Sequence, residues 1–168
     1  MRNTNFSMKS ILLFSLLVLL FSACSKEDAV VTGPDYVGTW SATMTQDGIQ
    51  VKDNMTFTKN GFTDLNQIYY SATNTWIDIM KTTGTISVTG STMTITYTGI
   101  GVATDLSGTI TISSAGSSTF QSLITENGIP LTFNSKYSVT GNKMTIMTDT
   151  DGDGLYTGIN ETTVYTKQ

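Results

Sequence analysis

A short acidic stretch near the C-terminus carries the clearest metal-binding pattern in the chain. It reads Asp149-Thr150-Asp151-Gly152-Asp153-Gly154, with a carboxylate at every second position and a glycine directly after the third. Oxygen ligands that alternate in this way converge on Ca²⁺, and the glycine permits the sharp bend of the loop. In this register the Leu155 carbonyl would be the next ligand, and Asn160 followed by Glu161 would complete the loop.

This stretch resembles the calcium loop of EF-hand proteins, with two departures. The last ligand should be a bidentate Glu, but Glu161 stands one residue late, and no flanking helices are evident. A solvated Asp/Gly turn explains the same residues. Two interpretations therefore stay open, a structural calcium site and a turn in solvent, and we expect no cofactor to be required.

The composition excludes most catalytic arrangements. The chain has no His and a single Cys, so Ser-His-Asp and Cys-His constellations and imidazole metal sites cannot form. No glycine-rich phosphate loop is present. A pair of carboxylates could still perform acid–base chemistry, but nothing marks two of Asp53, Asp64, Asp78 and Glu126 as facing each other, and we interpret them as solvated surface acids. We therefore expect a protein that is not an enzyme.

The charge balance argues against nucleic acid as a partner. Without Arg2 and Lys9, which lie in the N-terminal segment, the chain has seven basic and thirteen acidic residues. Nucleic acids and anionic lipid surfaces are bound through clustered basic residues. We expect no nucleic-acid partner and a monomer that is stabilised by packing and strand pairing, because there is no second Cys for a disulfide.

The N-terminal segment, residues 1–23, predicts a secretory signal peptide. Arg2 and Lys9 precede an apolar run, residues 11–23, whose only polar side chains are small hydroxyls. At about thirteen residues this run has the length of a signal-peptide core and is too short to span a bilayer.

The end of the apolar run, Leu20-Phe21-Ser22-Ala23-Cys24, resembles the lipobox of bacterial lipoproteins, although Phe21 stands where Leu is usual. In that family of signals the Cys becomes the first residue, its thiol receives a diacylglycerol, and its amine receives a further acyl chain such as palmitate. The resemblance implies that Cys24 is the lipid-attachment residue. Several acyl chains suffice for stable anchoring, so residues 24–35 would form a lipidated tether.

The residues after Cys24 bear on the location of the protein. Ser25-Lys26-Glu27-Asp28 is similar to the surface-export signal of Bacteroidetes lipoproteins. The similarity implies an outer-membrane lipoprotein exposed at the cell surface. A solvated linker and a periplasm-facing anchor are the alternatives.

From residue 36 onward the dominant sequence period is two. In residues 92–98 the apolar side chains Met93, Ile95 and Tyr97 share one face, and Thr occupies the other face. This pattern is typical of half-buried antiparallel strands. Residues 55–58, 85–89 and 109–113 repeat the pattern, and residues 66–81 are the one place where a short helix fits.

Turn residues separate these runs at short intervals, as at Gly90-Ser91 and Gly141-Asn142. The segments 87–95 and 138–146 are similar in sequence and suggest two hairpins of one design. We predict an all-β domain over residues 36–168, an antiparallel up-and-down meander of roughly eight to ten strands that closes into a barrel and so removes its edges.

The domain begins with Gly38-Thr39-Trp40, which resembles the G-x-W signature of lipocalins. In that family the Trp closes the barrel floor, and a basic residue from the last strand lies over its indole. The chain has no Arg after Arg2, so the resemblance assigns this place to Lys167, which makes a weaker, point-charge cation–π contact. Avidin-type barrels begin in a similar way, and another barrel or a sandwich stays open.

The lipocalin resemblance implies a membrane-anchored barrel that binds a small, largely apolar ligand. Barrels of about eight strands either fill with their own side chains or hold one small ligand. The alternative is a surface module that contacts protein or glycan through exposed aromatic residues such as Tyr69, Tyr70 and Trp76.

Overall fold

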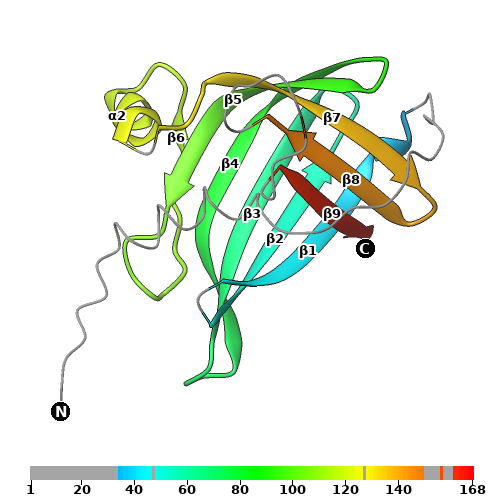
Figure 1. The fold of residues 1–168 in the computed structure, drawn as a ribbon. Helices are drawn as coiled ribbons and strands as arrows, with labels where there is room; N and C mark the ends of the chain where they lie inside the picture. Colours follow the sequence, from blue (N-terminus) through cyan, green and yellow to red (C-terminus); the bar gives the residue numbers. More distant parts are fainter. Residues whose placement is uncertain (1–33, 47, 127, 150–155, 157–160) are drawn as a thin grey trace.

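The computed structural model describes residues 34–46, 48–126, 128–149, 156 and 161–168, which form an antiparallel β-structure with one short α-helix (Figure 1). The elements in chain order are the 3-10 helix η1 (Pro34–Tyr36), β1 (Gly38–Gln46), β2 (Ile49–Phe57), β3 (Gly61–Tyr70), β4 (Thr75–Thr89), β5 (Thr92–Val102), β6 (Ser113–Ser114), α2 (Ser118–Glu126), β7 (Thr132–Thr140), β8 (Lys143–Thr148) and β9 (Thr162–Lys167).

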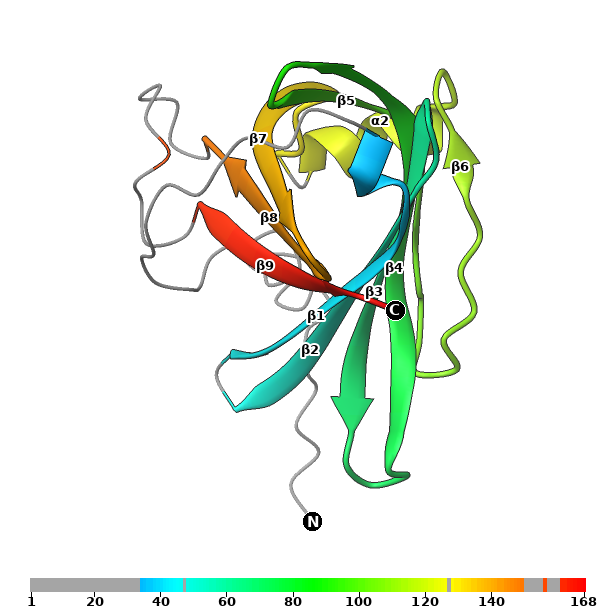
Figure 2. The same cartoon turned by 90° about the vertical axis from the view of Figure 1, so that its right-hand side faces the viewer.

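Eight of the nine strands in this sheet close into a barrel, which Figure 2 shows along its axis. Neighbours in the sequence are neighbours in the barrel from β1 to β5, β7 follows β5, and β9 returns to pair with β1. The short β6 lies beside the second half of β5. The predicted all-β meander and its closure into a barrel are confirmed.

The side chains alternate between the barrel interior and the outer surface as the sequence period predicted. In β5, Met93 and Ile95 are buried, while Thr94 and Thr96 make hydrogen bonds to Asn134 and Thr132 across the outer face. The two similar segments form the β4–β5 and β7–β8 hairpins, and each turns at a glycine with a φ of 60°. Left-handed backbone of this kind is what two-residue hairpin turns require.

One end of the barrel, the floor, is closed where β1 begins. Trp40 has no exposed surface, and its Nε1 donates a hydrogen bond of 2.8 Å to the carbonyl oxygen of Tyr36 in η1. The Tyr36 ring packs edge-on against Phe57 and Tyr137. Lys167 on β9 pairs with Trp40 and places Nζ 5.2 Å from the centroid of its ring.

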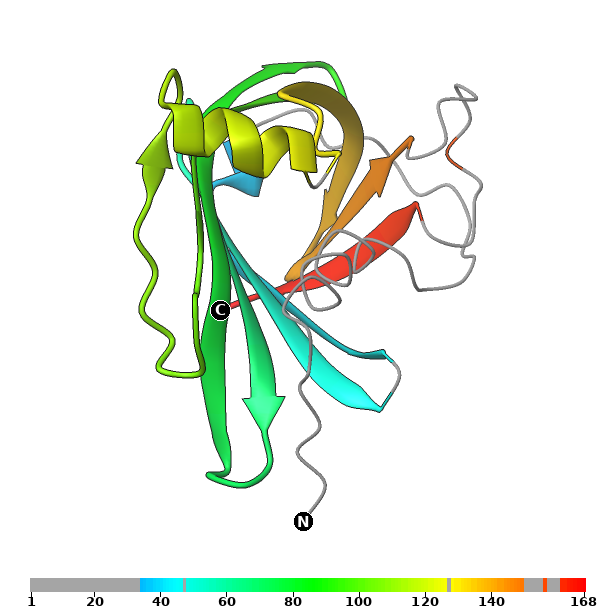
Figure 3. The same ribbon diagram turned by 90° about the vertical axis from the view of Figure 1, so that its left-hand side faces the viewer.

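The other end, the mouth, is crossed by α2 (Figure 3). Phe120 of α2 is fully buried against Met80 of β4 and Ile100 of β5, and Leu123 and Ile124 pack beside them. These helix positions recur three and four residues apart, so they share one face of the helix. Ser117 caps the helix, because its Oγ accepts a hydrogen bond from the Phe120 N–H at 3.1 Å.

Two local predictions from the sequence were wrong. Residues 66–81, where a short helix fitted the sequence, form the hairpin of β3 and β4, and the helix is α2 instead. At nine residues α2 is too short to show a sustained helical period. Residues 109–113 alternate like a strand, but only Ser113 of this run pairs with β5. The run passes so close to Gly101 that a Cβ there would lie 2.5 Å from the Thr111 carbonyl oxygen.

Within the described residues, no helix is long and apolar enough to cross a membrane.

Because Trp40 closes the floor, we expect the stability of the barrel to depend on this residue. We expect Trp40→Ala to lower the free energy of unfolding by about 3–5 kcal/mol, because it removes a fully buried indole and its hydrogen bond to Tyr36. Urea unfolding followed by circular dichroism measures this loss. Thr43→Ala, at an exposed position of the same strand, is the control and should cost well under half as much. Equal losses in the two variants would contradict the assigned role of Trp40.

Candidate ligand-binding site

Two carboxyl groups lie inside the barrel just beyond the floor. Asp53 of β2 is 4% exposed and Asp64 of β3 is 8% exposed. In the register of the two strands Asp53 is opposite Asn66, and Asp64 is opposite Met55, so the two acids are diagonal neighbours on the interior face. The interpretation of Asp53 and Asp64 as solvated surface acids was therefore wrong.

Each of these acids accepts a hydrogen bond from a buried neighbour. The Tyr165 hydroxyl on β9 donates to Asp53 Oδ2 at 2.6 Å, and Asn66 Nδ2 donates to Asp64 Oδ2 at 3.0 Å. Tyr165 has no exposed surface and reaches Asp53 from the opposite end of the chain. These contacts fix the orientation of both carboxyl groups within the barrel.

The remaining oxygen atoms of the pair have no donor outside the pair itself. Apart from each other, Asp53 Oδ1 and Asp64 Oδ1 have no hydrogen-bond partner among the described residues, and the buried Thr82 Oγ1 has none either. Thr82 is 2% exposed and stands directly opposite Asp64 on β4, so it belongs to the same interior face. Buried polar atoms without partners are costly and rare in folded proteins.

Burial is the main cause of the altered acidity of the pair. It raises the pKa of both Asp53 and Asp64, and the neighbouring Asp53 raises that of Asp64 well above its usual range. Hydrogen bonds from Asp64 and Tyr165 act in the opposite direction on Asp53. The pair therefore retains a proton to a higher pH than isolated carboxyl groups would. Burial and the same charges raise the pKa of the Tyr165 and Tyr97 hydroxyls, which stay neutral.

From the acid pair toward the mouth, the interior face becomes apolar and partly exposed. Asn66 is opposite Met80, and the next interior row consists of Met44, Val51, Ile68 and Ile77 on four successive strands. Of these, Val51 is buried and the other three are partly exposed. The interior thus combines a polar base with apolar walls, as small-molecule sites in proteins do.

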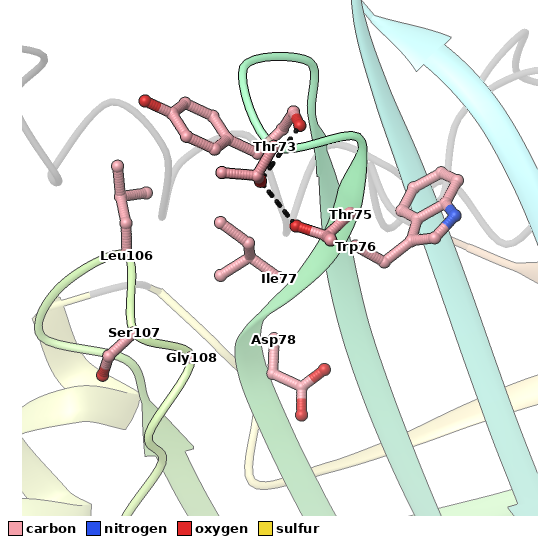
Figure 4. A pocket seen from close by; sticks show the side chains of 9 residues that line it. Thr73, Thr75, Trp76, Ile77, Asp78, Leu106, Ser107 and Gly108 are labelled. Carbon is pink, nitrogen blue, oxygen red and sulfur yellow. Dashed lines mark hydrogen bonds between the residues drawn. The ribbon is translucent and has the colours of Figure 1, made fainter.

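A pocket of about 430 Å³ lies where the β3–β4 hairpin extends past the mouth (Figure 4). Its lining comprises Tyr70, Thr73, Thr75, Trp76, Ile77, Asp78, Leu106, Ser107 and Gly108. Ile77 points to the side of Leu106, and Trp76 points to the opposite side of the strand. Through their pairing with Ile68 and Tyr70, Ile77 and Thr75 belong to the same face of the hairpin as Asp64. The pocket therefore adjoins the interior face.

The aromatic residues singled out in the sequence divide between the two faces of this hairpin. Trp76 packs against Tyr69 on the outer face, and Lys52 Nζ lies 4.1 Å from the centroid of the Trp76 ring. Tyr70 is 37% exposed and lines the pocket. Trp76 thus has an intramolecular cation on one side, which leaves less of its ring for a partner.

The other acids considered in the sequence lie apart from the pair. Asp78 Oδ1 accepts a hydrogen bond of 2.7 Å from Gln67 on the outer face, and Glu126 is exposed at the end of α2. Asp53 and Asp64 could have been found from the sequence, because each occupies a position of the interior period. Asp53 alternates with Val51 and Met55, and Asp64 follows Phe62 at the same spacing.

Several predicted site residues lie outside the described residues. They are the lipid-attachment residue Cys24 and the loop residues Asp151, Asp153, Leu155 and Asn160. Asp149 and Glu161 are described and flank that loop, and the Thr148 N–H donates to the Glu161 carbonyl oxygen at 2.8 Å. Calcium binding there stays a prediction.

Comparison with known proteins gives no match to a family model and none to a curated protein. The three residues on which the resemblance to lipocalins rests lie close together in the structure. Gly38, Trp40 and Lys167 meet at the floor, and Gly38 has a φ of 136° and lies against the Lys167 side chain.

The acid pair predicts a characteristic dependence of stability on pH. A carboxyl group whose pKa is raised by folding contributes stability below its unfolded pKa of 3.8, and this contribution is lost as the pH rises through the folded value. Asp64→Asn keeps a neutral donor toward Asp53. We expect the unfolding free energy of this variant, relative to wild type, to increase from pH 4 to pH 8 by about 1.4 kcal/mol per unit of raised pKa.

Chemical denaturation at intervals of one pH unit measures this difference. Glu126→Gln, at the exposed end of α2, is the control and should follow the wild-type curve. If the Asp64→Asn curve also runs parallel to wild type, Asp64 is not the protonated partner.

Proposed function

We propose that this protein is a membrane-anchored cell-envelope lipoprotein whose barrel binds a small ligand in its interior. One observation carries the binding function: Asp53, Asp64 and Thr82 present unpartnered buried oxygen atoms at the base of an interior with apolar walls. The proposal is of a binding protein and not of an enzyme.

Packing alone does not favour carboxyl groups in the barrel interior. Burying a carboxyl group costs several kcal/mol unless its hydrogen bonds are complete, and replacement by an apolar side chain is often stabilising. The same strands supply apolar residues at adjacent interior positions, such as Met55 beside Asp53 and Phe62 beside Asp64. Carboxyl groups at these two positions are therefore better explained by ligand binding than by a contribution to the stability of the fold.

The arrangement of polar and apolar groups changes the expected ligand. A largely apolar molecule would leave the acid pair without donors, while a molecule with one polar end and an apolar body matches both parts of the interior. The pocket at the mouth, in which Ile77 and Tyr70 contribute to the lining, provides the approach. We therefore propose an amphipathic ligand.

We expect the protein purified from its native membrane to carry a small molecule that native mass spectrometry detects, at about one copy per chain. Ile68→Trp enlarges a side chain of the interior row between the acid pair and the mouth, so it should reduce the occupancy at least tenfold. Tyr69→Trp, one residue away on the outer face, is the matched control and should retain the molecule. Equal occupancy in both variants, or none in wild type, would count against the interior site.

The anchor part of the proposal rests on the lipobox-like sequence that ends at Cys24. We expect wild-type cells to incorporate an alkyne-labelled palmitate into the protein and to retain it in the outer-membrane fraction. Cys24→Ser should abolish the label, because Cys24 provides both the thiol and the amine that carry the acyl chains, and Ser25→Ala is the control. A Cys24→Ser chain that still carries the label would disprove lipidation at this residue.

A further inference from the structure

We propose that the ligand of the barrel carries a protonated amine, which binds between Asp53 and Asp64, and an apolar body directed toward the mouth. This inference rests on the proposed function and names the chemical class of its ligand. It is carried by the juxtaposition of two buried carboxyl groups and a buried hydroxyl, none of which has a complete set of partners.

The charge inside the barrel has one sign. Among the described residues, the buried charged side chains are Asp53, Asp64 and Glu161, and no lysine or arginine is buried with them. The groups that face the pair are Asn66 on its own strand β3, Thr82 on β4, Tyr97 on β5 and Tyr165 on β9. All four are neutral. A ligand cation would supply the missing counter-charge, and an anionic ligand would be repelled.

The hydrogen-bonding capacity of an ammonium group fits the vacant acceptors. A primary ammonium has three N–H donors and no acceptor. At the pair, three buried oxygen atoms have no donor outside the pair, namely Asp53 Oδ1, Asp64 Oδ1 and Thr82 Oγ1, and a fourth such atom, Gln46 Oε1, lies further along β1. Asp53 Oδ2 and Asp64 Oδ2 are already engaged by Tyr165 and Asn66 and would hold the carboxylates in place. Charge-assisted hydrogen bonds of this kind are roughly twice as strong as neutral ones.

The apolar body of the ligand follows from the direction of β3. Ile68 lies four residues beyond Asp64 on the same interior face, which corresponds to about 13 Å along the strand. Its row contains Met44 and Ile77, both partly exposed, and Met side chains adapt readily to a new neighbour. A ring or a short alkyl chain attached to the amine would reach this row.

Binding of such a ligand exchanges a proton for a cation. Without ligand, the pair holds one proton between its two carboxyl groups. When R–NH₃⁺ enters, its N–H groups donate to both carboxylates, the pair loses that proton to solvent, and no covalent bond within the ligand changes. The net reaction takes up one cation and releases one proton. Affinity should therefore increase with pH until Asp64 is ionised in the unliganded protein.

Calorimetric titration of the full-length protein in a neutral detergent tests this inference with three probes of similar size: 2-phenylethylamine, 2-phenylethanol and 3-phenylpropionate. We expect the amine to bind at least tenfold more tightly than the alcohol, and the carboxylate not to bind. In buffers of different ionisation enthalpy, amine binding should release up to one proton per chain, with a smaller release as the pH rises, whereas alcohol binding should release none.

Substitutions of Asp53 and Asp64 test whether these two residues bind the amine. Asp53→Asn and Asp64→Asn should each weaken amine binding at least tenfold, remove the proton release and change alcohol binding by a much smaller factor. Asp35→Asn, at an exposed position of η1 and away from the pocket lining, is the control and should behave as wild type. Circular dichroism confirms that each variant is folded, and Asp64→Glu, which restores the carboxyl group, should recover part of the amine affinity.

The outcomes separate this inference from the proposed function. Equal affinity for amine and alcohol, with binding lost in Ile68→Trp, overturns the amine and leaves the interior site standing. Amine binding that survives in both Asn variants also overturns it, because the cation then binds elsewhere. If none of the three probes binds, the amine inference fails, and the occupancy of the native protein decides the proposed function separately.

Discussion

Closure of the sheet is the constraint from which the other properties of this molecule follow. Once β9 pairs with β1, every second side chain of eight strands must enter a common interior. A strand can bring one polar side chain to the outer face only by shifting its register, which would move all its other side chains to the opposite face as well. At most positions the chain meets this constraint with apolar side chains such as Met93, Ile95 and Met144. Asp53 and Asp64 are held inside by the same register, whatever their desolvation costs.

The two ends of the barrel are built differently, so the interior near the floor differs from the interior near the mouth. At the floor, Trp40 is locked between the Tyr36 carbonyl and the Lys167 ammonium. At the mouth, α2 contributes apolar side chains of its own, and Leu123 and Ile124 remain partly exposed. Polar groups concentrate between the two ends, next to the aromatic side chains of the floor.

The sequence predicted the strand pattern, the hairpins at Gly90 and Gly141 and the closed barrel, because two-residue alternation and turn chemistry are local properties. It did not predict α2, whose nine residues bury chiefly one side chain, Phe120. The alternation in residues 109–113 wrongly predicted a strand, because alternation shows that a strand can form but not that a neighbouring strand has a free edge to pair with it.

The acid pair shows a similar limit. The interior period of β2 and β3 already placed Asp53 and Asp64 on the inner face, so their burial could be read from the sequence. Their proximity could not, because it depends on the register between two strands. The partner Tyr165 lies 112 residues away from Asp53 in the chain and becomes a neighbour only when the barrel closes.

The pairing of β1 with β9 joins only Trp40 with Lys167 and Ser41 with Thr166, whereas the other pairings that close the barrel join five or more residue pairs. This short ladder is a seam at which local opening of the barrel would begin. The hydrogen bond from Tyr165 on β9 to Asp53 on β2 spans the seam from inside, passing over β1. The Asp53 carboxyl group thus also links β9 to β2 across the seam. A ligand bound to its other oxygen atom would change how often the barrel opens.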